Sequence, residues 1–182
     1  MTRTSHTHPL QIAEVHTGKG WGRIGITFCP GKKQPHAFTG AWDRDLDLDL
    51  DAVVNWGAAA VLTLVEQHEL ETLRVAGLGE AVRSRYISWF HLPIADVSTP
   101  CAEFEEQWRT AGEQLRSLMR SGFNVMVHCK GGLGRAGMIA ARLLVELGHE
   151  PNSGRSSGPA ATPGCAGDLR TRARGAFTCS YP

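Results

Sequence analysis

The chain has 182 residues, of which 42% are hydrophobic and 20% are charged, and its formal net charge is +1 at pH 7. This composition is ordinary for a globular protein, and the length suits one domain with a full-sized core. A nearly neutral chain gives no electrostatic reason to expect a nucleic acid or an anionic membrane as partner. The longest weakly polar run, residues 52–65, is too short to cross a bilayer.

The cysteine content points to a reducing compartment. No two of the five cysteines form a Cys-x-x-Cys pair, and the first residues lack the apolar core of a secretory signal. An odd number of cysteines in this context indicates free thiols rather than a disulfide framework. We therefore expect a cytoplasmic protein. Separately, we expect it to be a monomer. The cysteines are Cys29, Cys101, Cys129, Cys165 and Cys179.

Residues 1–20 are polar and are predicted to form a flexible N-terminus. Their three histidines, His6, His8 and His16, have a spacing that matches no standard metal site. Residues 24–28 then have the β-branched and apolar character of a short strand, which a Cys-Pro-Gly turn at 29–31 ends.

Acidic and leucine residues alternate over positions 45–51. Strict alternation is typical of a strand, and the acids also resemble a calcium loop, but the central glycine and closing glutamate of such a loop are missing. We favour the first turns of a helix that runs to about Trp56, because carboxylates there stabilise the positive end of the helix dipole. Gly57 then ends the helix.

The middle of the chain alternates between strands and helices. Residues 60–65 form an apolar, β-branched run that predicts a buried strand. Short helices are expected near 66–73 and 79–85, followed by a strand over 86–92 that Pro93 stops.

A longer helix is expected after residue 99. Thr99 is suited to cap it, with Pro100 at its first position and Glu103 in its first turn. Ser121 and Gly122 mark its end. Its apolar residues recur with helical spacing and indicate a face that packs on the core: Phe104, Trp108, Ala111, Leu115 and Leu118.

The last regular segments are a strand over 124–128 and a helix over 134–147, which Gly148 ends. Strands that alternate with helices predict an α/β fold, with a mainly parallel central sheet flanked by helices. Residues 21–150 would form this domain. The segment 151–182 is rich in Gly, Pro, Ser and Arg and is expected to be irregular, as a disordered tail or the product of a shifted reading frame.

The loop between the last strand and the last helix has the composition of an anion site. Cys129 and Arg135 bracket five residues, three of which are glycine. Backbone N–H groups of such a loop can point inward as a nest, and the helix N-terminus adds its positive end. This environment would lower the pKa of the Cys129 thiol, and the Arg135 fork matches two phosphate oxygens. The loop has neither the Lys-Ser/Thr of a Walker A motif nor a dinucleotide fingerprint.

Two further residues are candidates for supporting roles. Thiolate attack on a phosphoester requires an acid for the leaving oxygen, and Asp96 lies in a proline-flanked loop, although the residues alone favour a turn-capping role for it. His128 alternates to the opposite side of the strand from Cys129, so it cannot form a simple Cys–His pair. We interpret it as a hydrogen-bond donor that orients the loop.

The segment 128–135, His-Cys-Lys-Gly-Gly-Leu-Gly-Arg, resembles the signature loop of the cysteine-based protein phosphatases. With Pro-Ile-Ala-Asp at 93–96, Thr99-Pro100 and the Pro30-Gly31-Lys32 turn, it is most similar to the cyclin-dependent-kinase-associated (inhibitor 3-type) dual-specificity phosphatases and their bacterial relatives. The similarity extends over about 24–148.

This resemblance implies a hydrolase acting on a phosphorylated protein, with Cys129 as nucleophile, Asp96 as general acid and Arg135 as phosphate clamp. It implies no metal and no other cofactor. The phosphate cradle would consist of backbone N–H groups of Lys130, Gly131, Gly132, Leu133, Gly134 and Arg135.

One departure bears on rate: Ala136 stands where the family usually has Ser or Thr, whose hydroxyl helps the thiolate leave. Three alternatives therefore stay open: a catalytically weak phosphate-binding module, a phosphatase for a small metabolite, and a rhodanese-like sulfurtransferase. Arg135 and Asp96 weigh against the last, because persulfide transfer needs no leaving-group acid. The altered tail also predicts reduced stability, because the last helix would lack packing partners.

Overall fold

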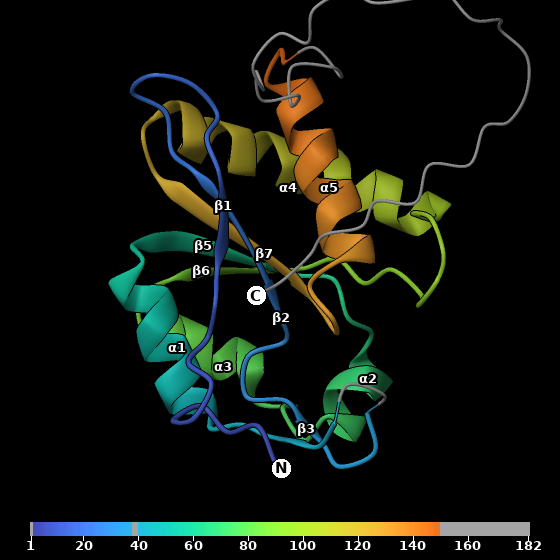
Figure 1. The fold of residues 1–182 in the computed structure, drawn as a ribbon. Helices are drawn as coiled ribbons and strands as arrows, with labels where there is room; N and C mark the ends of the chain where they lie inside the picture. Colours follow the sequence, from blue (N-terminus) through green and yellow to red (C-terminus); the bar gives the residue numbers. More distant parts are fainter. Residues whose placement is uncertain (1, 38–39, 150–182) are drawn as a thin grey trace, which may run out of the picture. The chain divides into compact units, whose positions relative to one another are not determined.

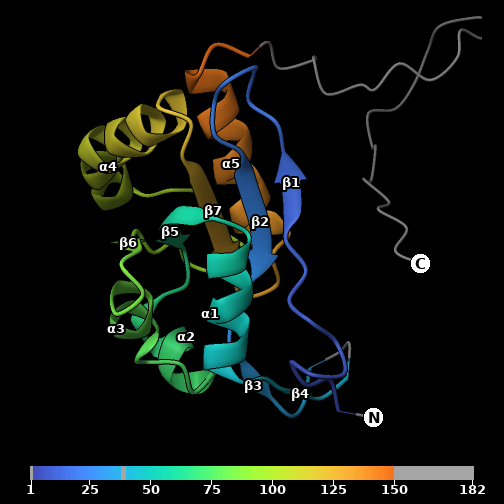
Figure 2. The ribbon, with the colours of Figure 1, turned by 90° about the vertical axis from the view of Figure 1, so that its left-hand side faces the viewer.

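The structure is a computed structural model, and it describes residues 2–37 and 40–149. A five-stranded sheet lies between two layers of helices (Figures 1 and 2). Four strands run parallel and the first pairs antiparallel with its neighbour, which confirms the predicted α/β class with a mainly parallel sheet. The strand order is β1 (Ala13–Val15), β2 (Ile24–Phe28), β7 (Asn124–Cys129), β5 (Ala58–Thr63) and β6 (Ser88–His91).

Strand β7 lies at the centre of the sheet and is buried on both faces. Successive side chains of a strand point to opposite faces, so Val125, Val127 and Cys129 join the core beneath α4 (Ala102–Arg120) and α5 (Gly134–Glu146). Met126 joins the opposite core. That core is covered by α1 (Leu46–Asn55), α2 (Gln67–Thr72) and α3 (Leu78–Arg83) (Figure 1).

The acid-and-leucine repeat forms helix α1, as predicted, and not a strand or a calcium loop. The Asp45 carboxylate accepts a hydrogen bond from the Leu48 N–H and so caps the helix. The helix ends at the predicted place, where Gly57 has a φ of 84°. This left-handed conformation suits glycine because it has no Cβ.

Several predicted boundaries differ from the structure; the strand predicted over 60–65, for example, is β5 at Ala58–Thr63. Helix α4 begins at Ala102, with Cys101 at the N-cap, so the expected cap at Thr99 is wrong. Cys101 keeps an extended backbone (φ −91°, ψ 178°), which delays the helix beyond Pro100. Strand β6 begins at Ser88 and not at residue 86, because Tyr86 has a φ of 59°, outside the extended region.

The N-terminal segment contains more structure than the sequence predicts. Residues 13–15, within the segment expected to be flexible, form edge strand β1 on β2. Ser5 is buried and donates a hydrogen bond of 2.8 Å to the Asp49 carboxylate. A second small sheet pairs β3 (Lys33–Gln34) with β4 (Trp42–Asp43). Strands of two or three residues are too short to produce a detectable hydrophobic period.

The predicted tail, 151–182, with Cys165 and Cys179, lies outside the described residues. Within 2–37 and 40–149, no helix combines the length and the apolar character that crossing a membrane requires.

Candidate active site

The glycine-rich loop lies at the carboxyl end of the central strand, where open α/β sheets place their ligands. Strand β7 ends at Cys129 and helix α5 begins at Gly134. Cys129 is a free thiol with 3% of its surface exposed, and the Gly132 N–H lies 3.2 Å from its Sγ. Gly132 has a φ of 77°, and a Cβ there would lie 2.6 Å from the Phe28 backbone nitrogen. Glycine is therefore required at this turn.

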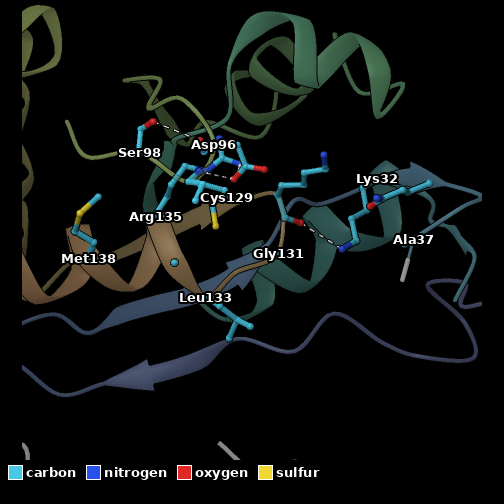
Figure 3. A pocket seen from close by; sticks show the side chains of 13 residues that line it. Lys32, Ala37, Asp96, Ser98, Cys129, Gly131, Leu133, Arg135 and Met138 are labelled. Atoms are coloured by element: carbon cyan, nitrogen blue, oxygen red, sulfur yellow. Dashed lines mark hydrogen bonds and ion pairs between the residues drawn. The ribbon is translucent and has the colours of Figure 1, made fainter. Parts of the chain in front are cut away.

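The loop forms the wall of a pocket of about 660 Å³ (Figure 3). Cys129, Asp96 and Arg135 all line it, so the structure brings together the three residues that the resemblance singles out. The loop contributes Lys130, Gly131, Leu133 and Gly134 to the same surface, and the remaining lining residues are Lys32, Gln34, Ala37, Val97, Ser98 and Met138.

Arg135 is held by a second charged residue that the sequence reasoning missed. Its two terminal nitrogens contact the Glu69 carboxylate at 2.5 and 3.0 Å, and its Nη1 also donates to the Ile94 carbonyl at 2.9 Å. Both side chains are buried, so this is a bidentate pair with a fixed geometry. Burial alone would raise the pKa of the Glu69 carboxyl, but hydrogen bonds from Arg135 and from the Glu66 N–H outweigh it and lower the pKa.

Glu69 carried one signal in the sequence. Glu66 and Glu69 form a reciprocal capping box at the start of α2, and that spacing marks a helix N-terminus. It does not indicate that Glu69 also reaches Arg135, which lies on another element.

Asp96 reaches the pocket from the loop that follows β6. Its Oδ1 lies 3.2 Å from Nη2 of Arg135, and its side chain keeps 56% of its surface exposed. The same oxygen accepts a hydrogen bond from the Val97 N–H at 3.1 Å. Val97 has a φ of 57°, so a left-handed turn directly after Asp96 helps to set its position.

His128 contacts a neighbouring strand, and its predicted role in orienting the loop stays a prediction. Its Nε2 lies 2.8 Å from the Thr63 hydroxyl on β5, and that hydroxyl also accepts a hydrogen bond from Trp89 Nε1. Burial lowers the pKa of His128 to about 3, so the ring is neutral at physiological pH. A threonine hydroxyl can both donate and accept, so this contact fits either neutral tautomer of His128.

Ala136 is fully buried in the core beneath α4 and α5. Among the described residues that line the pocket, Ser98 alone carries a hydroxyl, and its Oγ donates to the Asp96 carbonyl at 3.4 Å. The described ranges also contain no cluster of three or more His, Cys, Asp or Glu side chains that could hold a metal ion.

A cysteine at the end of a central parallel strand, a glycine-rich loop and an arginine at the start of the next helix define the cysteine-based protein phosphatases. The family model described as "Polymorphic toxin system, DSP-PTPase phosphatase" matches residues 43–149, which is more than half of the chain. The chain therefore belongs to this family of dual-specificity-type phosphatases.

Comparison with known proteins supports the same assignment. Cyclin-dependent kinase inhibitor 3 of Homo sapiens is 31% identical over 146 residues, which cover 78% of this chain and 62% of that protein. The Rattus norvegicus protein of the same name is 30% identical over 124 residues, covering 68% and 55%. The chain thus spans less than two thirds of the length of these relatives.

Among solved structures, the kinase associated phosphatase with its catalytic-site cysteine replaced by serine matches with a TM-score of 0.67. The identity is 24%, and the match covers 79% of this chain and 78% of that one. This likeness confirms the fold.

Proposed function

We propose that the chain is a phosphoprotein phosphatase that hydrolyses its substrate through a phosphocysteine on Cys129. The observation that carries this proposal is the meeting of Asp96 and Arg135, 3.2 Å apart, in the pocket that Cys129 also lines. An acid, a nucleophile and a phosphate-binding guanidinium in one pocket are the groups that phosphoester cleavage by a thiolate requires.

In the first step, the Cys129 thiolate attacks phosphorus while the phosphate oxygens are held by Arg135 and the loop N–H groups. The S–P bond forms, the bond from phosphorus to the substrate oxygen breaks, and Asp96 gives its proton to that oxygen. The Gly132 N–H, 3.2 Å from Sγ, stabilises the thiolate before attack. The products of this step are the dephosphorylated substrate and phosphocysteine.

In the second step, the Asp96 carboxylate accepts a proton from water, whose oxygen attacks phosphorus. The S–P bond breaks, inorganic phosphate leaves and the thiolate is restored. Ala136 supplies no hydroxyl to the departing sulfur, and the Ser98 hydroxyl is already bound to the Asp96 carbonyl. The second step is therefore slow in this proposal. If this step were slow enough to prevent turnover, the protein would be a catalytically weak phosphate-binding module.

The pocket mouth favours a protein substrate over a small metabolite. Val97 and Leu133 line the pocket and expose 99% and 71% of their surfaces. Exposed apolar side chains around a polar site are typical of surfaces that contact another macromolecule. A phosphorylated polypeptide would cover them, whereas a small phosphate ester would leave them in water.

Hydrolysis of an aryl phosphate tests the proposal, with Cys129→Ser as the main variant and Cys101→Ser as its matched control. Cys101 is exposed and lies outside the pocket. We expect Cys129→Ser to abolish turnover while inorganic phosphate still binds, and Cys101→Ser to leave both unchanged. Equal activity of Cys129→Ser and the unmodified protein would overturn the assignment of the nucleophile. Transfer of sulfur from thiosulfate to cyanide would favour a sulfurtransferase instead.

A further inference from the structure

Lys32 is a buried cation in the pocket wall that lacks a carboxylate partner among the described residues. It exposes 5% of its surface. The two other cations buried to this degree are both paired, Arg44 with Asp49 and Arg135 with Glu69. Placing an unpaired charge in a protein interior is costly. Within the chain, the Cys129 thiol of the same pocket can oppose this charge when it is ionised, and an anionic ligand in the pocket would supply the counter-charge that no carboxylate provides.

Among the described residues, the Lys32 side chain has a single hydrogen-bond partner. Its Nζ donates to the Lys130 carbonyl at 3.3 Å (Figure 3), and an ammonium group has three N–H donors. Its charge rests against two aromatic faces, 4.7 Å from the centre of the Phe28 ring and 4.1 Å from that of Trp42. Such faces stabilise a cation without neutralising it. Burial lowers the pKa of Lys32 to about 8, so at pH 7 most of it still carries its charge.

A rigid turn presents Lys32 to the pocket. The preceding residue, Gly31, has a φ of 71°, and a Cβ there would lie 2.9 Å from the Leu46 Cα. The Gly31 N–H donates to Asp49 at 2.8 Å, and Asp49 is in turn fixed by Arg44 at 2.7 Å. The ammonium is thus held before a ligand arrives, which reduces the entropy cost of binding.

We propose that Lys32 forms a second anion-binding subsite, which selects phosphorylated segments with another negative group beside the phosphorylated residue. This inference rests on the proposed phosphatase function and names the class of substrate for that site. The phosphate to be cleaved would lie in the loop over Cys129, while the neighbouring carboxylate or phosphate contacts Lys32. Lys130 lines the same pocket and adds to the positive potential there.

Phosphopeptides that differ in one neighbour test this subsite. All peptides contain the same phosphorylated residue, either tyrosine or threonine, whichever the unmodified protein hydrolyses. One set has neutral neighbours, a second has a glutamate on either side of that residue, and a third has a second phosphorylated residue on either side. We expect kcat/KM for the best doubly anionic peptide to exceed that for the neutral one about tenfold, as a charge-assisted hydrogen bond provides. Lys32→Met should reduce this ratio to about one.

Lys33→Met is the matched control, because Lys33 is the next residue, pairs with Asp43 at 2.7 Å and does not line this pocket. The Lys33→Met variant should keep the preference for the doubly anionic peptide. Comparison of the glutamate-containing peptides with the doubly phosphorylated peptides identifies which second anion the subsite binds. An unchanged ratio in Lys32→Met would overturn the proposal. An equal decrease of kcat/KM for all peptides in Lys32→Met would also overturn the proposal. It would mean that Lys32 only stabilises the loop through its hydrogen bond to the Lys130 carbonyl.

Binding of inorganic pyrophosphate and inorganic phosphate, measured by calorimetry, separates this inference from the proposed function. If the unmodified protein hydrolyses neither peptides nor an aryl phosphate, the phosphatase function fails. The subsite is then still tested, because it requires a preference for pyrophosphate that Lys32→Met removes. If the protein is active but prefers neither the doubly anionic peptides nor pyrophosphate, the second subsite alone is wrong.

Discussion

The carboxylate of Asp96 lies 3.2 Å from the guanidinium of Arg135, in a structure whose other Arg135 contacts go to Glu69 and the Ile94 carbonyl. Each terminal nitrogen of Arg135 therefore already has two oxygen partners. A phosphate that binds Nη2 must displace Asp96, and because Asp96 is more than half exposed, it is the partner that can move. In the proposed mechanism, this displacement would free the Asp96 carboxyl group for the leaving oxygen and so couple phosphate binding to the positioning of the acid.

Replacement of Asp96 by asparagine should separate binding from catalysis. We expect kcat for an aryl phosphate to fall by about 10² to 10⁴, because no proton reaches the leaving oxygen. Inorganic phosphate should bind more tightly, because the competing negative charge at Arg135 is gone. Steady-state kinetics and calorimetry measure the two effects. Asp47→Asn, at an exposed position of α1, is the control, and an unchanged kcat in Asp96→Asn would contradict the role of Asp96.

Replacement of Glu69 by glutamine should affect both stability and phosphate binding. The amide removes the charge that compensates buried Arg135, and breaking a buried pair typically lowers the free energy of unfolding by about 3–5 kcal/mol. We expect weaker binding of inorganic phosphate, since Arg135 loses its fixed orientation. Urea unfolding and calorimetry test this, with the exposed Glu71→Gln on the same helix as control. If neither quantity changes, Glu69 does not position Arg135.

Replacement of Ala136 by serine should accelerate the second chemical step. In the family that this loop resembles, a hydroxyl at this position helps the thiolate leave, and a charge-assisted hydrogen bond is sufficient for about a tenfold increase in steady turnover. Rapid-mixing kinetics should show a burst of product in the unmodified protein and a smaller burst in Ala136→Ser. Ala140→Ser, buried one turn later in α5, tests for a general effect of a buried hydroxyl and should keep the burst.

Stability should fall on acidification because of His128. Its pKa is about 3 in the folded protein and about 6.5 in the unfolded chain, so between these values the unfolded state binds the additional proton. Unfolding is thus favoured as pH falls below about 6.5. Between pH 7.5 and 5, we expect this group to remove about 2 kcal/mol from the free energy of unfolding. Urea titrations at both pH values should show a smaller loss for His128→Leu, and equal losses would contradict this role.

Much of the fold follows from patterns within single segments. The strand over 124–128, the glycine loop and the helix after it are contiguous, so their order alone placed Cys129 and Arg135 at one site. The apolar stripe of α4 and the acid-rich start of α1 were likewise readable, because helix periodicity and capping are local properties. Edge strand β1 and the small β3–β4 sheet could not be predicted in this way, because these strands are defined by their pairing with other segments.

The sequence by itself determined the composition of the loop: a cysteine, three glycines and an arginine within seven successive positions, 129–135. Tertiary structure decided which residues act on that loop. Glu69 follows β5, Asp96 follows β6 and Lys32 follows β2, and these strands reach Cys129 only because they run parallel to β7 and end at the same edge of the sheet. No local period encodes such a meeting, because it depends on strand order, and strand order is set by how the two cores pack.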